Sequence, residues 1–192
     1  GLTQGVTTIE LCAAYAVIAN QGNYIEPLYY TKILDHDGNV LIEKNSVGRS
    51  VIKESTAWLL TSAMEDVVNY GTGTACQLDN MTVAGKTGTT DDYNDLWFAG
   101  YTPYYTCTVW SGFDNNEKLP DDYSREFHKN LWKKVMNRIH EGLENKDFVM
   151  PSTVEKVSIC ADTGLLPRAG CSVITEYFDI GDVPTEYCDQ HF

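Results

Sequence analysis

Three successive extended segments constrain the fold of this chain most strongly. Residues 83–89, 96–102 and 106–113 are rich in aromatic and β-branched side chains, and polar or proline-containing turns separate them. Segments with helical patterns come before and after this group. This order predicts an α+β fold, in which an antiparallel β-sheet is flanked by α-helices.

The helices are predicted from the spacing of apolar residues. Residues 8–20 have this spacing, and so does a segment that Ser55 or Thr56 would cap and that runs to about Asn69. Between these two segments, "DHDGN" predicts the turn of a hairpin. Residues 123–142 predict an amphipathic helix. Its inward face would carry Phe127, Leu131, Val135, Met136 and Ile139.

The composition changes near the end of the chain, from Lys146 onward, toward Pro, Gly, Thr and Cys. We therefore expect two units. Residues 1–145 would contain the strands, and residues 146–192 would form a tail or a small appended module. A length of 192 residues suits one globular domain with such a tail.

The charge balance excludes some classes of partner. The net charge is -13, from 27 acidic and 14 basic residues, so the surface repels phosphate backbones and no nucleic-acid partner is expected. No apolar run reaches the roughly 18 residues that cross a bilayer, and no signal peptide opens the sequence. Because Gly1 is not a natural start residue, we expect a processed chain or a part of a longer one.

The segment "AGKTGTT" allows two chemical interpretations. A phosphate-binding loop would need a glycine where Asn80 stands and a helix beginning at Lys86, which the following residues disfavour. On a strand, Thr87 and Thr89 would share one face, opposite Lys86 and Gly88. A substrate could then approach the backbone at the glycine, and the next N–H could stabilise an oxyanion. A solvated strand end is the simpler alternative.

The neighbouring segments favour the strand interpretation. "NYGTGT" precedes "AGKTGTT", and "DLWFAGYTP" and "VWSGFD" follow it. "GVTTIELCAAYAVIANQGNYIEP" lies upstream, and "ICADTGLLP" and "PTEYC" lie in the tail. Over nearly its whole length, the chain resembles the C-terminal part of the transpeptidase (penicillin-binding) domain of class A bifunctional penicillin-binding proteins, whose motifs include K-T-G.

The resemblance implies a D,D-transpeptidase that cross-links peptidoglycan through an acyl-serine. Lys86 would support the electrostatics of the serine–lysine site, as the catalytic residue within this chain. Thr87 and Thr89 would bind the substrate carboxylate beside Gly88, and the Thr89 N–H would form part of the oxyanion hole. The implied partners are stem peptides ending in D-Ala-D-Ala and β-lactams, with no cofactor. The implied location is extracytoplasmic, on the outer face of the bacterial cytoplasmic membrane.

Two motifs of such a site are not matched in this chain. S-x-N does not occur, and the one S-x-x-K is Ser50–Lys53, where β-branched residues and a later helix start disfavour a nucleophile. We therefore expect the serine to lie outside the chain and the chain alone to be inactive. The alternatives are a non-catalytic module that binds cell-wall peptide or a partner protein, and a serine β-lactamase fragment. A sheet edge left unpaired would also favour self-association.

The chain contains six cysteines. Cys12 and Cys107 fall on apolar faces and are expected to pack in the core. Cys160 and Cys171 flank a short loop that a disulfide could close in an exported protein. Cys188 and His191 could join them in a zinc site, but the spacing is not that of a known finger, so no metal is expected.

Overall fold

The computed structural model describes residues 5–192. The helices are α1 (Thr8–Ala19), α2 (Glu54–Asn69) and α3 (Phe127–Ile139). The short strands of the first part are β1 (Asn23–Ile25), β2 (Lys32–Leu34), β3 (Val40–Glu43) and β4 (Gly48–Ser50). The longer strands are β5 (Ala84–Thr89), β6 (Asp95–Tyr101), β7 (Thr106–Gly112), β8 (Val154–Cys160) and β9 (Val173–Asp179).

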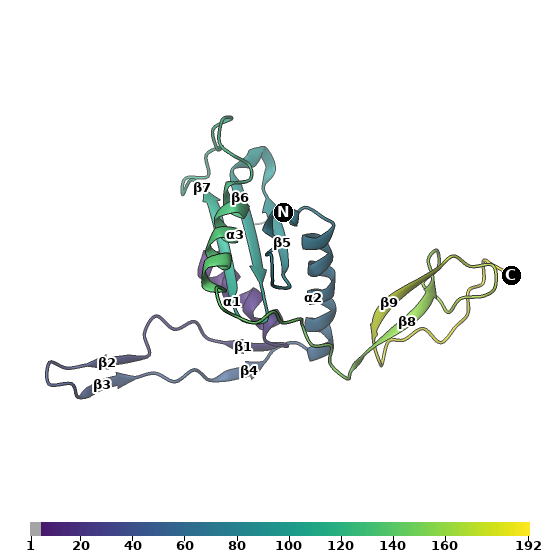
Figure 1. The fold of residues 1–192 in the computed structure, drawn as a ribbon, viewed down its shortest axis with the longest axis horizontal. Helices are drawn as coiled ribbons and strands as arrows, with labels where there is room; N and C mark the ends of the chain where they lie inside the picture. Colours follow the sequence, from purple (N-terminus) through teal and green to yellow (C-terminus); the bar gives the residue numbers. More distant parts are fainter. Residues whose placement is uncertain (1–4) are drawn as a thin grey trace.

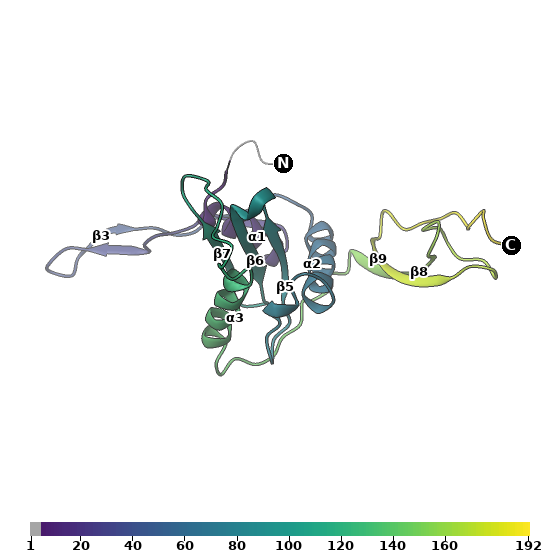
Figure 2. The ribbon, with the colours of Figure 1, turned by 90° about the horizontal axis from the view of Figure 1, so that it is seen from above.

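A three-stranded antiparallel sheet in the order β5-β6-β7 forms the centre of the molecule. Helix α3 lies on one face of this sheet, α1 lies on the other, and α2 runs beside β5 (Figures 1 and 2). Pairing of Gly85 with Gly100, and of Trp97 with Trp110, fixes the register. The predicted α+β fold, with an antiparallel sheet flanked by helices, is confirmed.

The core beneath α3 is built around two aromatic rings. Phe98 and Trp132 are both 0% exposed and meet edge to face, with their ring centroids 4.9 Å apart. The Trp132 indole N–H donates to the Cys107 carbonyl at 2.9 Å. Gly100 makes room for both rings, because a Cβ there would lie 2.7 Å from Phe98 and 3.0 Å from Trp132.

The buried face of α3 differs from the predicted one. Its buried residues are His128, Trp132 and Met136. Of the residues expected to face inward, four are exposed: Phe127, Leu131, Val135 and Ile139. The helix carries two apolar stripes, and the sheet selects the one whose indole fits over Gly100. The helix also begins later than predicted, at Phe127.

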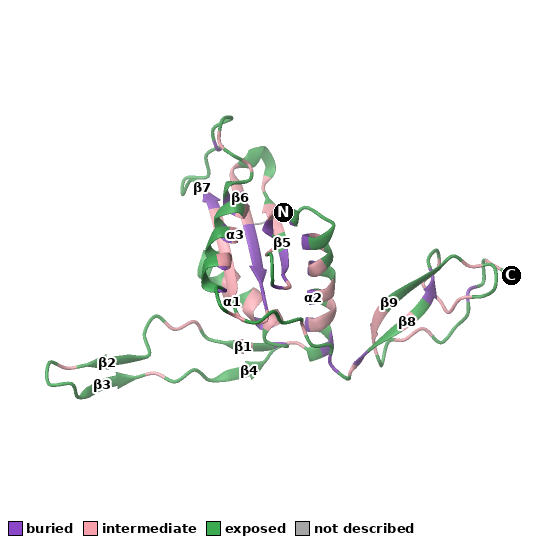
Figure 3. Cartoon of the chain, viewed as in Figure 1, coloured by how far each residue is buried: buried purple, intermediate pink, exposed green. Residues whose placement is uncertain are grey.

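The first part of the chain follows the sequence prediction closely. Thr7 caps α1 and forms a reciprocal capping box with Glu10. The predicted hairpin is present, because β2 and β3 pair around the "DHDGN" turn. This hairpin extends away from the sheet and is mostly exposed (Figures 1 and 3).

Strands β8 and β9 pair along seven residues each and form the tail, on the side of the sheet away from the hairpin (Figures 1 and 2). The first turns of α2 contact it. Ser55 does not cap α2, because Lys53 occupies the cap position and the Ser55 hydroxyl donates to the Asp179 carboxylate instead. Trp58 and Tyr177 add an edge-to-face contact with centroids 4.6 Å apart.

Candidate functional site

The predicted site residues lie on the edge strand of the central sheet. Strand β5 pairs with β6 on one side, and no other strand pairs with its outer edge within residues 5–192. The Thr90 N–H donates to the Asp95 carbonyl across the ladder. Because backbone groups of successive residues alternate in direction along a strand, the N–H of Thr89 points to the free edge.

Lys86 reaches over this edge. Its side chain is exposed, and its ammonium donates to the Thr87 carbonyl at 2.9 Å, with the Thr87 hydroxyl oxygen 3.4 Å away. The contact holds a positive charge beside the outward-facing backbone, where a bound anion would meet it.

The structure adds a residue that the sequence did not point to. The Thr72 hydroxyl lies 2.7 Å from that of Thr87, and the two share a hydrogen bond. Thr72 belongs to the glycine-rich turn after α2, where a Cβ on Gly71 would come 3.0 Å from the Val67 backbone. Lys129 of α3 donates to the Thr72 carbonyl at 3.4 Å. The sequence offered one signal for this contact, because the "NYGTGT" turn lies close to "AGKTGTT" along the chain.

The next turn is held by hydrogen bonds to a partly buried carboxylate, that of Asp95. The Asp95 carboxylate accepts from the Trp110 indole at 2.8 Å and from the Thr90 hydroxyl at 3.2 Å. The Asp95 N–H donates back to the Thr90 hydroxyl oxygen at 2.8 Å. These bonds fix the end of β5, and with it the direction of the Thr89 N–H.

Gly88 packs directly against the sheet. A Cβ there would lie 3.2 Å from Trp97 Cβ, so a side chain would require Trp97 to shift by a few tenths of an ångström. The absence of a side chain also leaves the backbone of the edge strand open to a ligand.

The S-x-x-K at Ser50 does not form a helical pair. Ser50 ends β4, where it pairs with Asn23, and its hydroxyl points to the Ile52 carbonyl at 3.5 Å. Lys53 lies at the N-cap of α2. Serine and lysine therefore do not occupy successive turns of one helix, as this nucleophile arrangement requires.

The cysteines form two groups, and none of the six is in a disulfide. Cys76 is fully buried, and burial raises its pKa to about 12. Cys107 is half-buried against the core cluster, and burial raises its pKa to about 11. The structure brings Cys160 and Cys171 together without an S–S bond, in a cluster with Cys188 and His191. The disulfide between them stays a prediction.

Within the described part of the chain, no helix is both long enough and apolar enough to cross a bilayer.

Comparison with known proteins gives a consistent picture. The family model "Penicillin binding protein transpeptidase domain" matches residues 1–137, and "Penicillin-binding protein 1A, C-terminal domain" matches residues 150–192. Penicillin-binding protein 1A of Clostridium tetani is 33% identical over 196 residues, covering 97% of this chain. The chain spans about a quarter of that relative's length, 25%.

Solved structures agree with the family match. A crystal structure of penicillin-binding protein 1A from Haemophilus influenzae superposes with a TM-score of 0.78, at 24% identity, over 95% of this chain and 33% of that one. PonA1 from Mycobacterium tuberculosis, in complex with penicillin V, gives 0.67 at 29% identity over 76% of this chain and 41% of that one. The chain belongs to the penicillin-binding protein transpeptidase family, with a penicillin-binding protein 1A C-terminal domain following the transpeptidase part.

Proposed function

We propose that this chain is the substrate-binding part of a D,D-transpeptidase that cross-links peptidoglycan stem peptides through an acyl-serine. The observation that carries the proposal is the free edge of β5, where Lys86 and the hydroxyls of Thr87 and Thr72 surround an outward-facing backbone. A peptide can add to such an edge by strand pairing, with main-chain hydrogen bonds giving affinity.

The residues at this edge suit a peptide that ends in a carboxylate. The hydroxyls of Thr87 and Thr89 donate to the D-alanine carboxylate, and Lys86 supplies the positive charge that favours it. The outward N–H of Thr89 stabilises the oxyanion that forms when the serine attacks the scissile carbonyl. Thr72 orients the Thr87 hydroxyl through their shared hydrogen bond.

The attacking serine, in this proposal, belongs to a segment outside residues 1–192. The extended position of Ser50 supports this assignment, since its neighbouring lysine does not share a helical turn with it. The same free edge supports self-association of the isolated chain by edge-to-edge strand pairing. Light scattering of the isolated chain tests that point, and a strictly monomeric species at high concentration would contradict it.

The proposed partners are stem peptides ending in D-Ala-D-Ala and β-lactam antibiotics, which acylate the same serine. The proposed location is the outer face of the bacterial cytoplasmic membrane, where the peptidoglycan substrate is found. The residues divide accordingly into a transpeptidase part, 1–145, and a tail, 146–192.

Fluorescent penicillin labelling of the full-length protein tests the proposal. We expect Lys86→Ala to slow acylation about 10²- to 10³-fold, and Thr87→Val about tenfold, because each removes a group that contacts developing or fixed negative charge. Lys134→Ala and Thr175→Val are matched controls on exposed parts of α3 and β9, and should label at the wild-type rate.

Two further arms separate the alternatives. The isolated chain should not label, and Ser50→Ala in the full-length protein should label normally. Labelling of the isolated chain that disappears in Ser50→Ala would overturn the placement of the serine. Rapid turnover of a chromogenic cephalosporin would instead indicate a β-lactamase.

A further inference from the structure

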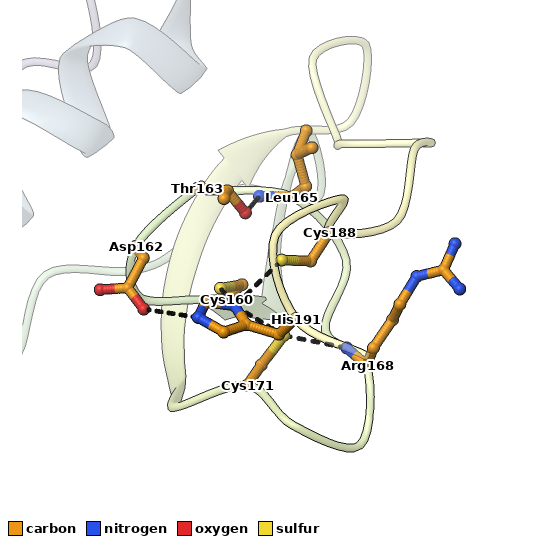
Figure 4. Close-up of polar contacts among 8 residues, drawn as sticks. All are labelled: Cys160, Asp162, Thr163, Leu165, Arg168, Cys171, Cys188 and His191. Atoms are coloured by element: carbon orange, nitrogen blue, oxygen red, sulfur yellow. Dashed lines mark hydrogen bonds and ion pairs between the residues drawn. The ribbon is translucent and has the colours of Figure 1, made fainter.

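Four potential metal ligands gather at the far end of the tail (Figure 4). Cys160 ends β8, Cys171 lies in the loop before β9, and Cys188 and His191 come from the C-terminal segment. Their ligand atoms all lie within 4.8 Å of one another. Three chain segments separated in sequence therefore converge on one point.

The distances within this cluster fit a single metal ion. The His191 Nδ1 lies 3.5 Å from the sulfur of Cys160, 3.6 Å from that of Cys171 and 3.2 Å from that of Cys188. In a tetrahedral zinc site, bonds of about 2.3 Å to sulfur and about 2.0 Å to nitrogen place those atoms about 3.5 Å apart. Three thiolates and one imidazole complete such a site and leave no open position, as in structural zinc sites.

The surroundings of the cluster orient its ligands. The Asp162 carboxylate lies 3.4 Å from His191 Nε2, so the ring can donate to the carboxylate and direct Nδ1 toward the sulfurs (Figure 4). The Arg168 N–H donates to the Cys171 sulfur at 3.2 Å. Such outer hydrogen bonds are typical of metal-bound histidine and thiolate.

The tail also has little apolar core of its own. Between residues 150 and 192 the buried residues are Pro151, Val154, Ile159, Cys160 and Cys188. Two of these five are members of the cluster itself. Units of about this size seldom fold on an apolar core alone, and a metal or disulfides usually supply the missing stability.

We propose that Cys160, Cys171, Cys188 and His191 bind one structural zinc ion that holds the tail folded. The proposal replaces the sequence-based expectation of no metal site, which rested on the unfamiliar spacing of the ligands. A disulfide between Cys160 and Cys171 explains less of the geometry, because Cys188 and His191 would then converge on the same point without a role. The inference is independent of the proposed transpeptidase activity.

Metal content of the full-length protein is the first test, after purification under reducing conditions without chelator. We expect about one zinc ion per chain, measured by inductively coupled plasma mass spectrometry. Replacement by cobalt should give the visible absorption of a tetrahedral thiolate site. Cys171→Ser and His191→Gln should lose both signals. Cys12→Ser and His36→Gln, which change the same residue types outside the cluster, should keep them.

Asp162→Asn tests the outer contact. It should keep the zinc stoichiometry but weaken affinity about 10- to 100-fold in competition with a chelating dye. Unchanged affinity would contradict the orienting role of the carboxylate.

Thiol alkylation of the wild-type protein distinguishes a zinc site from a disulfide even if the variants fail to fold. With zinc bound, the three cluster thiols should resist alkylation until a chelator is added. A disulfide would instead protect Cys160 and Cys171 until a reductant is added. That result, or reduced thiols that hold no metal, would overturn the proposal.

Discussion

In the central sheet, β5, β6 and β7 lie over a core in which Phe98 and Trp132 are completely buried. In the tail, β8 and β9 leave most of their apolar side chains exposed or half-buried, and Cys160 and Cys188 are among the few buried residues. Packing therefore stabilises the first region, and the proposed zinc site would stabilise the second. The difference follows from size, because a small unit buries too little apolar surface to offset the entropy of ordering its chain.

The same contrast explains where each region can carry chemistry. The sheet has a rigid interior, so its edge strand can display Lys86, Thr87 and an outward backbone without losing order. In the tail, thiols and an imidazole converge in the interior, and in the proposed zinc site the bound ion would hold them in place. The two regions should therefore respond independently to substitutions in their own cores, and four experiments test this.

The largest expected effect comes from Cys188→Ser. Loss of a zinc ligand should remove protection from hydrogen exchange throughout β8 and β9, because folding of such a unit depends on metal binding. Exchange in β5 to β7 and the rate of penicillin acylation should stay within about twofold of wild type, as expected for distant, independent sites. Collapse of protection in both regions would show that the tail supports the sheet.

Trp132→Ala is the reciprocal change. Truncating this fully buried indole should lower the free energy of unfolding of the sheet by about 3–5 kcal/mol, measured by denaturant titration of the full-length protein. Phe127→Ala, at an exposed position of the same helix, should cost less than about 1 kcal/mol. Zinc content should be unchanged in both variants. Loss of zinc from Trp132→Ala would show that the tail depends on the core of the sheet.

Glu65 on α2 gives a pH-dependent test within the transpeptidase part. Burial, followed by the negative charges of Asp147 and Asp66, raises its pKa to about 7. Between its unfolded pKa, near 4.5, and about 7, the folded carboxyl keeps a proton that the unfolded one has lost. The protonated Glu65 carboxyl therefore makes its full contribution to the free energy of unfolding at low pH, and this contribution is lost as the pH rises toward 7.

Glu65→Gln should remove this pH dependence. At pH 8 it should raise the free energy of unfolding by about 1 kcal/mol, after allowance for the solvent exposure of the side chain, and at pH 4 it should have little effect. Glu141→Gln, on an exposed residue, is the control. An equal gain at both pH values would contradict a titrating Glu65.

The smallest effect is expected where the two regions meet. Ser55→Ala removes the hydrogen bond from α2 to Asp179, and should speed exchange of the amides near Asp179 by about tenfold at most. Thr56→Ala, one residue along the helix, is the matched control. Faster exchange at the cysteine cluster as well would show that docking on α2 also stabilises the metal site.

Several local features of the fold could be predicted from the sequence. The hairpin at "DHDGN", the helix at residues 8–20, the three strands and their antiparallel sheet all followed from turn chemistry and from the spacing of apolar residues. The Lys86–Thr89 segment was placed on a strand for the same reason, and β5 spans Ala84–Thr89. These features depend on contacts between residues that are near in the chain, which the local pattern encodes.

The tertiary structure decided what depends on partners distant in sequence. The buried stripe of α3 was predicted wrongly, because both stripes are apolar and the space over Gly100 made the choice. His128 and His140 are only 2% and 9% exposed, and the local sequence pattern does not show what covers them. The contact of Ser55 with Asp179 had no local signal either. For the contact of Thr72 with Thr87, nearness in the chain was the only signal.

The sequence by itself determined the three strands of the central sheet and the hairpin, since periodicity and turn residues act over a few positions; the role of "AGKTGTT" followed from the family resemblance. Only the tertiary structure brought Cys160, Cys171, Cys188 and His191 to one point. The physical reason is that a metal site requires particular distances between its ligand atoms. The loops that connect these residues do not fix those distances until the chain has folded.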